Sequence, residues 1–337
     1  MPFLDVTRRN LLAAATAGMM AWSLGGGGVQ AQDPIRLRIS TPAVETDWHA
    51  KMLTVFKDEI EKSAPGEFDV EIHLNGTLFQ QGTEPVAMQR GNLEMAIISA
   101  FDIAKQIPEW SIFTAGYLIR DPEHQEKVFG SEIGQEMFQR VKDEMNIKIL
   151  DVIYLGTRQL NLRGDKQVTT PADLAGVKLR MPGSDTWQFL GSALGASPLP
   201  MAFGEVYTAL QTGAIDGQDN PLPTVRAAKF YEVTDQIVLT SHLVDGIFLS
   251  LAGDVWDELT PEQQDKVMAA AEAASVYNNE NRLKEEAELV EFFRGEGLKV
   301  YEPDVDSFRE HVQAAYLESE YSETWPEGMV ERINTIE

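Results

Sequence analysis

The stretch that decides the fold, residues 177–221, reads VKLRMPGSDTWQFLGSALGASPLPMAFGEVYTALQTGAIDGQDNP. It opens with an apolar-polar alternation over residues 177–181, which predicts a short strand that a Pro-Gly pair then ends. Residues 185–194 and 204–212 follow with the apolar spacing of helices. A strand followed by helices is the building unit of an α/β fold, so we expect a sheet with helices on its faces.

The same pattern occurs nearer the start of the chain. Residues 35–39 and 70–74 alternate apolar and polar side chains, and residues 95–98 form a short apolar run. All three are typical of strands. Helical patterns separate them at residues 52–60 and 84–89. The order strand-helix-strand-helix-strand predicts a largely parallel sheet in this part of the chain.

Two long elements are expected to connect two such lobes. Residues 147–153 form a strand that is long enough to leave one lobe and enter another, and Gly156 after it allows a change of direction. Residues 248–252 predict a buried strand that returns to the first lobe. Thr260 then begins a capping box, and helical residues continue to Arg294, which predicts a rod of about 50 Å that crosses both lobes.

The first 31 residues are predicted to be an export signal and are set apart from the fold. Thr7-Arg8-Arg9 is a twin-arginine start, and an apolar stretch with a glycine run follows it. Small residues at Val29 and Ala31 suit a signal peptidase, so we expect cleavage near Ala31 and a mature protein in the periplasm. An uncleaved anchor is the alternative, but the apolar segment is short against the ~20 residues of a span. We therefore expect no membrane insertion after cleavage.

The rest of the chain exceeds the ~150 residues of a typical domain and predicts two lobes. We expect lobe I to comprise residues 32–156 and 246–285. Lobe II should comprise residues 157–245 and 286–337, including the C-terminal helices.

The charge excludes several kinds of partner. The chain has 53 acidic and 28 basic residues and a net charge of −25. Such a surface repels nucleic acid and anionic lipid. An anionic ligand would need a local group of basic side chains, so individual arginines become candidates for binding.

Cofactors and catalytic sets are not expected. The chain has no cysteine, which excludes cysteine catalysis and thiolate metal sites. Its five histidines show neither metal-ligand spacing nor a His-Glu-x-x-His motif. We therefore predict no metal site, no cofactor and no catalytic residues.

Three consecutive blocks carry a resemblance to a known family. Residues 180–187 (RMPGSDTW), 194–207 (LGASPLPMAFGEVY) and 209–221 (ALQTGAIDGQDNP) resemble the core signature of the DctP family. This family comprises the extracytoplasmic solute-binding proteins of tripartite ATP-independent periplasmic (TRAP) transporters. The similarity extends more thinly over residues 35–297.

The resemblance implies a fold and a function. The fold would be a periplasmic-binding-protein clamshell, with two α/β lobes of mixed, mostly parallel sheets and a long C-terminal helix spanning both. The protein would bind a small organic carboxylate, such as a C4-dicarboxylate or a sugar acid, and deliver it to the membrane subunits of a TRAP transporter. An exported α/β enzyme and a sensor that reports to a kinase are the alternatives.

The resemblance also implies second-lobe ligand contacts. Arg180 matches the arginine that pairs with the ligand carboxylate, a role for which a planar guanidinium is suited. Its alternative is an ion pair with an acidic neighbour, Asp185 or Glu205. Further predicted contacts, each with a purely structural alternative, are Asn220, Phe203 and Arg158, with Arg163 competing for the role of Arg158.

First-lobe contacts are predicted from strand ends, because ligands of parallel sheets bind outside the carboxyl ends of the strands. Asp47 and Trp48 follow the first strand, Gln81 follows the second, and Ser99 follows the third. Trp187, early in the helix of residues 185–194, is a further candidate. Some members of the family carry an acidic residue where we align Ser99.

Overall fold

The computed structural model describes residues 33–337. The predicted export signal, with its twin arginines and the cleavage site near Ala31, lies outside the described residues. Within the described part, none of the helices combines the length and the apolar character needed to cross a membrane.

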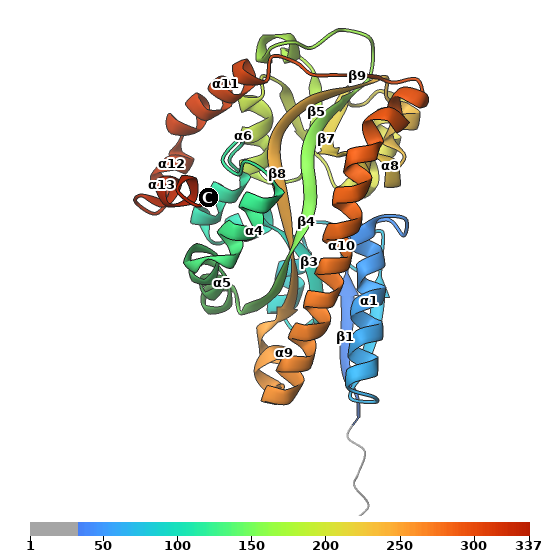
Figure 1. The fold of residues 1–337 in the computed structure, drawn as a ribbon, viewed down its shortest axis with the longest axis vertical. Coiled ribbons are helices and arrows are strands. Elements are labelled where there is room, and N and C mark those ends of the chain that lie inside the picture. The colour runs from blue at the N-terminus through green and yellow to red at the C-terminus, as the bar shows by residue number, and fades with distance from the viewer. Residues whose placement is uncertain (1–32) are drawn as a thin grey trace, which may run out of the picture. The chain divides into compact units, whose positions relative to one another are not determined.

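A single sheet organises residues 33–337 (Figure 1). Its nine strands run in the order β2-β1-β3-β8-β4-β7-β5-β6, and β9 pairs with β8 beside this path. The strands are β1 (Ile35–Ser40), β2 (Phe68–His73), β3 (Met95–Ser99), β4 (Ile147–Leu162), β5 (Lys178–Met181), β6 (Ser197–Pro200), β7 (Gly217–Pro221), β8 (Gln236–Ala252) and β9 (Lys299–Tyr301).

Parallel pairings occupy the two ends of the sheet, and antiparallel pairings occupy its centre. Strand β1 is parallel to β2 and β3, β5 is parallel to β6 and β7, and β8 is parallel to β9. The antiparallel pairs are β3-β8, β4-β8 and β4-β7. The predicted fold class, a two-lobed α/β fold with mixed, mostly parallel pairing, is confirmed.

The long strands β4 and β8 join the two ends of the sheet. Strand β3 pairs with the end of β8, and β7 pairs with the end of β4. We call β1, β2, β3 and the adjoining halves of β4 and β8 the first-lobe side, and β5, β6, β7 and the other halves the second-lobe side. Strand β4 continues past Ile153 because Gly156, at a φ of 127°, takes up a bulge that a side chain would not tolerate beside Pro221.

The first two helices of the first-lobe side, α1 and α2, lie where the sequence predicted helical patterns. Helix α1 buries one apolar face, and Asp47 caps its N-terminus by accepting a hydrogen bond from the backbone N–H of His49. The elements are α1 (Trp48–Ser63), α2 (Glu84–Gln89), α3 (Ala100–Ala104), η1 (Pro108–Thr114), α4 (Pro122–Gly130) and α5 (Glu132–Met145).

Short helices of the second-lobe side connect its strands. Thr170 and Asp173 form a capping box at the start of η2. The elements are η2 (Pro171–Leu174), α6 (Asp185–Ala193), η3 (Phe203–Glu205), α7 (Val206–Thr212), α8 (Leu222–Ala227) and η4 (Phe230–Val233). Helix α9 (Gly253–Glu258) follows the end of β8 that pairs with β3, on the first-lobe side.

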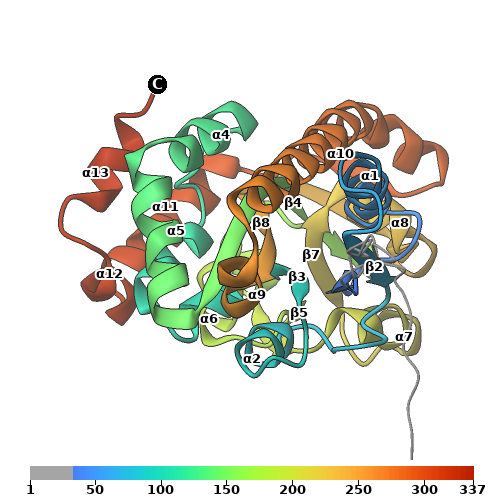
Figure 2. The ribbon, with the colours of Figure 1, turned by 90° about the horizontal axis from the view of Figure 1, so that it is seen from below.

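The predicted long helix is α10 (Pro261–Gly295), and Thr260 and Gln263 form the expected capping box at its start. It packs against α1 and β4 and, further along, against α8 and β9. Helix α10 therefore contacts both sides of the sheet. Figure 2 shows α1, α8 and α10 on one side of the long strands and α4, α5 and the C-terminal helices on the other.

The C-terminal helices α11 (Val305–Leu317), α12 (Glu320–Thr324) and α13 (Met329–Asn334) pack on η1 and α4 as well as on α6. The hydroxyl of Tyr316 donates to the carbonyl of Thr114 at 2.9 Å, and Trp325 Nε1 donates to Ser111 Oγ at 2.9 Å. Residues assigned to lobe II thus contact residues assigned to lobe I. The exact lobe boundaries stay a prediction.

Candidate functional site

A cavity lies where the carboxyl ends of β1 and β3 on one side approach those of β5 and β7 on the other. The space between its lining atoms, part of which is open to solvent, is about 520 Å³. Six of the predicted binding residues line it: Gln81, Ser99, Arg158, Arg180, Phe203 and Asn220. The remaining lining residues are Thr41, Pro42, Ala43, His49, Ile97, Phe101, Leu155, Pro182, Thr224 and Ile247.

Arg180 stands at the end of β5, just before Pro182 ends the strand. Its side chain is 1% exposed. Nε donates to the carbonyl of Met201 at 2.9 Å, and Nη2 donates to Oε1 of Gln81 at 3.0 Å. These two hydrogen bonds to neutral groups aim the guanidinium but leave its charge uncompensated.

The Arg180 guanidinium makes no ion pair within residues 33–337, so neither Asp185 nor Glu205 neutralises it. Burial lowers its pKa to about 9, although the negative charges of Asp219 and Glu205, which form no ion pair with it, act to raise it. The positive charge of Arg158 acts in the same direction as burial. A buried cation without a counter-ion is costly in free energy. A carboxylate entering the cavity would supply the missing partner.

Gln81 connects the two sides of the sheet. Its Oε1 accepts from Arg180 Nη2 and also from the backbone N–H of Phe203 at 2.9 Å. One amide oxygen from the loop after β2 therefore holds two elements of the second-lobe side. The geometry describes closed lobes around the cavity.

A buried carboxyl supports the loop that carries Gln81. Oε2 of Glu84, at the start of α2, accepts from the backbone N–H of Gly82 at 2.7 Å. Burial, together with the nearby carboxyl of Asp102, raises the pKa of Glu84 to about 8. Glu84 therefore holds a proton at neutral pH and adds no negative charge beside the ligand cavity.

Arg158, on β4, differs from Arg180 because carboxylates surround it. Nε donates to Asp245 Oδ2 at 2.7 Å, and Nη1 contacts Asp219 Oδ2 at 3.2 Å. The guanidinium carbon lies 4.2 Å from the ring centre of Trp187, in a cation–π contact. Burial acts to lower the pKa of Arg158, but Asp219 and Asp245 outweigh it and raise the pKa.

Asp219 is the more strongly held of these two carboxylates. His242 Nε2 lies 3.2 Å from its Oδ2, and His242 Nδ1 lies 2.8 Å from Thr240 Oγ1. Burial raises the pKa of Asp219, but Arg158 and the His242 hydrogen bond outweigh it, so the net shift is downward. For Asp245, burial prevails over Arg158 and the pKa is raised.

Asn220 is placed by a chain of side-chain amides along β7. Its Oδ1 accepts from Arg158 Nη1 at 3.3 Å, and its Nδ2 donates to Oε1 of Gln218. Gln218 in turn donates to Oδ1 of Asn161 on β4 at 3.2 Å. These hydrogen bonds hold the amide side chains of β7, a strand that is buried throughout.

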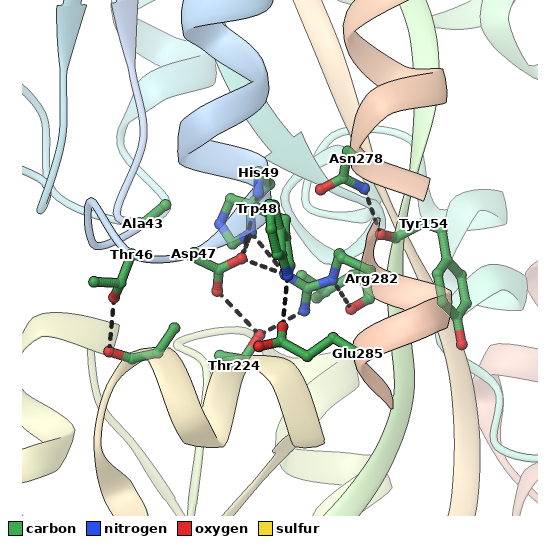
Figure 3. A network of polar contacts seen from close by, with 12 residues as sticks. Ala43, Thr46, Asp47, Trp48, His49, Tyr154, Thr224, Asn278, Arg282 and Glu285 are labelled. Carbon is green, nitrogen blue, oxygen red and sulfur yellow. Dashed lines mark hydrogen bonds and ion pairs between the residues drawn. The ribbon is translucent and has the colours of Figure 1, made fainter. Parts of the chain in front are cut away.

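Two predicted first-lobe contacts, Asp47 and Trp48, do not line the cavity (Figure 3). Asp47 forms an ion pair with Arg282 of α10, and its Oδ1 lies 2.8 Å from His49 Nδ1. Arg282 also donates to Thr224 Oγ1 at 2.8 Å. Asp47 therefore points toward Arg282 and away from the cavity, whereas its neighbours His49 and Thr224 line the cavity.

Trp48 also points toward α10, because a residue of that helix accepts a hydrogen bond from its indole N–H. Its Nε1 donates to Glu285 Oε2 at 2.6 Å, and Glu285 also pairs with Arg226 of α8 at 2.7 Å. Nearby, Thr46 Oγ1 donates to the carbonyl of Ala227 at 3.1 Å. The loop before α1 is thus tied to both α8 and α10.

Trp187 and Arg163 also lie off the cavity. Trp187 is buried behind the lining, with one face under Arg158 and an edge contact to Phe101 at 5.9 Å. Arg163 is exposed, and its side chain lies over Gly213. Of the two arginines that competed for the second basic contact, Arg158 is therefore the one at the cavity.

The sequence analysis did not identify several residues of the site. Asp219 lies inside the quoted signature, but His242 and Asp245 come from β8, whose first half showed no clear strand signal. His49 lies at the start of α1 in the first lobe, and Thr224 lies at the start of α8 in the second. The one available signal for these residues was Asp219, which stands next to Asn220 in the signature. No group of three or more metal-ligating side chains is placed to hold a metal ion among residues 33–337.

Comparison with known proteins identifies the family. The profile of the DctP family, described as bacterial extracellular solute-binding protein, family 7, matches residues 39–323. The sialic acid-binding periplasmic protein of Vibrio cholerae is 32% identical over 269 residues, which cover 80% of this chain and 82% of that protein.

Two solved structures extend the comparison. A TRAP periplasmic solute-binding protein of Roseobacter denitrificans, with bound 3-deoxy-D-manno-oct-2-ulosonic acid (KDO), is 51% identical. Its TM-score is 0.88 over 90% of this chain and 100% of that one. Another, from Polaromonas sp. JS666 with bound D-erythronate, is 27% identical, with a TM-score of 0.83 over 90% of this chain and 99% of that one. The chain therefore belongs to the DctP family of bacterial extracellular solute-binding proteins, as its signature indicated.

Proposed function

We propose that this protein is the periplasmic receptor of a TRAP transporter and that it captures a sugar acid between its lobes. The observation that carries this proposal is the buried Arg180 guanidinium, which faces the cavity without a counter-ion. A ligand carboxylate is the group that this guanidinium can pair with in a bidentate geometry. The rest of the lining offers hydroxyl, amide and aromatic groups that suit a polyhydroxylated chain.

The relatives support a sugar acid in particular. The 51% identical protein holds KDO, and others hold L-galactonate, D-erythronate and β-D-galacturonate. KDO is a 2-oxo acid that carries several hydroxyls on an eight-carbon chain. We therefore take KDO as the first ligand to test.

KDO and the aldonates are expected to stabilise the protein against heat. A ligand that binds the folded state alone adds about 2.7 kcal/mol at a hundred times its Kd, which raises the melting temperature. A thermal-shift screen with KDO, sialic acid, galactonate and erythronate measures this, followed by calorimetric titration. Galactitol, which lacks the carboxylate, is the matched control and should leave the melting temperature unchanged.

The ligand screen can also contradict the proposal. If none of the acids shifts the melting temperature, or if galactitol stabilises as well as galactonate, the carboxylate receptor is refuted. Binding of C4-dicarboxylates in place of sugar acids would retain a receptor but reject the proposed ligand.

We also propose that the ligand leaves unchanged. One observation favours the enzyme alternative, since the Asp47–His49 pair beside the cavity resembles half of a catalytic triad. However, His49 makes no hydrogen bond to a cavity-lining hydroxyl within residues 33–337, so no activated nucleophile is in place. Mass spectrometry of KDO recovered after long incubation distinguishes the two, because an enzyme would yield a product of different mass or structure.

Delivery to membrane subunits completes the proposed function. Closure of the lobes would remove water from the Arg180 pair and so strengthen it, and opening at the membrane would release the ligand. Neighbouring genes for one small and one large membrane subunit would support the transporter, whereas a neighbouring sensor kinase would favour the signalling alternative. The proposed export, with cleavage near Ala31, is tested by N-terminal sequencing of the secreted protein.

A further inference from the structure

The ionisable residues that line the cavity are His49, Arg158 and Arg180, and they differ in how their charges are balanced. We propose that the cavity selects ligands with a single carboxylate and rejects dicarboxylates, because Arg180 is its one cation without an ionic partner within residues 33–337. This inference rests on the proposed function and narrows its ligand class.

Arg158 does not provide a second site for an anion. Asp219 and Asp245 both contact its guanidinium, at 3.2 and 2.7 Å, and all three side chains are buried. Both carboxylates lie within ion-pair distance of Arg158, so its charge already has partners inside the protein. The Nη2 group of Arg158 has no partner among the described residues, so it can still donate a hydrogen bond to a ligand oxygen.

His49 is balanced in the same way. Its Nδ1 lies 2.8 Å from Asp47 Oδ1, and Asp47 is itself paired with Arg282. Any positive charge on His49 would therefore be shared with this buried carboxylate. His49 can therefore form a hydrogen bond with a ligand, but it adds no unpaired cation to the cavity.

The first-lobe lining has no other charged group. It presents the backbone and side chains of Thr41, Pro42, Ala43, Gln81, Ile97, Ser99 and Phe101. A second carboxylate would lie against these neutral groups, and burying an unpaired carboxylate costs far more than burying a hydroxyl. Hydroxyls, in contrast, can pair with Thr41, Gln81 and Ser99.

Competition against bound KDO tests the charge limit. The probes are aldonate and aldarate pairs of equal chain length: erythronate with tartrate, xylonate with xylarate, and galactonate with galactarate. In the pair that competes best, the aldarate is expected to bind with an affinity at least about 100-fold lower than that of its aldonate. Each factor of ten in affinity corresponds to about 1.4 kcal/mol of binding free energy. Aldarates that compete as well as the aldonates at every chain length would overturn the inference.

The variant Asp219→Asn tests the cause. It removes a negative charge beside Arg158 while keeping an oxygen that can accept the hydrogen bond. Because Asp245 still contacts Arg158 at 2.7 Å, this variant is combined with Asp245→Asn. In the double variant we expect the ratio of aldarate to aldonate affinity to rise roughly tenfold, because Arg158 then has no carboxylate partner within residues 33–337. The control Asp151→Asn removes an aspartate from β4 outside the cavity lining. Equal ratios in the double variant, the control and the parent would reject the proposed role of Asp219 and Asp245.

These experiments also separate the inference from the function on which it rests. If KDO and the aldonates fail to bind at all, the sugar-acid receptor is wrong and the charge limit falls with it. If they bind but aldarates bind equally well, the receptor stands and the charge limit alone is wrong.

Discussion

Arg180→Ala is expected to weaken sugar-acid binding by about 2 to 5 kcal/mol, the cost of removing one partner of a buried charge pair. Arg180→Lys should also bind poorly, because an ammonium cannot reproduce the two parallel hydrogen bonds of a guanidinium. It would also lose the bond from Nε to Met201 that aims the side chain. Calorimetric titration with KDO or galactonate measures both losses.

The control for Arg180 is Arg163→Ala. Arg163 is an exposed arginine on the second-lobe side that does not line the cavity. Its loss should leave the affinity for the sugar acid within about twofold. Substitutions of exposed residues outside a binding site usually change the free energy by only about ±0.5 kcal/mol. An Arg180→Ala variant that binds like the parent would remove Arg180 as the anchor.

Arg282→Met is expected to lower the free energy of unfolding by about 3 to 5 kcal/mol, because it leaves the Asp47 carboxylate buried without its partner. Arg282 is completely buried and also donates to the carbonyl of Leu155 at 2.7 Å. Burial alone would raise the pKa of Asp47, but Arg282 and His49 outweigh it and hold the pKa well below its usual range. Urea denaturation at neutral pH measures the loss.

Two further variants identify the source of that loss. Lys284→Met places the same side chain at an exposed position of α10 and should change the stability by less than about 0.5 kcal/mol. Asp47→Asn combined with Arg282→Met should recover part of the stability, because the unpaired charge is then gone. If the double variant is less stable by the sum of the two single losses, the ion pair is not the cause.

The elements that the sequence predicted well are those in which local periodicity and burial agree. Helix α10 showed a capping box at Thr260 and no helix breaker before its end, and β1 showed a clean alternation. Strand β7 was not predicted, because Gly217-Gln218-Asp219-Asn220-Pro221 has the composition of a turn. Its buried polar side chains contact Arg158, His242 and Asn161, and such partners from other strands leave no local pattern.

The predicted site residues also fall into two groups, those that line the cavity and those that distant partners hold away from it. Ser99, predicted from a strand end, and Arg180 and Asn220, implied by the family resemblance, all line the cavity. Asp47 and Trp48 also follow a strand, but Arg282 and Glu285 of α10 engage them. Those helix residues lie more than two hundred positions away in the chain, and no spacing rule connects them. Ligand contact by the residues that line the cavity stays a prediction.

The most direct test of the central claim is a crystal structure of the protein with KDO. We predict the ligand carboxylate within about 3 Å of the Arg180 guanidinium nitrogens, a charge-assisted hydrogen-bond distance. The hydroxyls should lie toward the first-lobe wall of Thr41 and Ser99. A carboxylate that instead pairs with Arg158, or a ligand bound outside this cavity, would contradict the account.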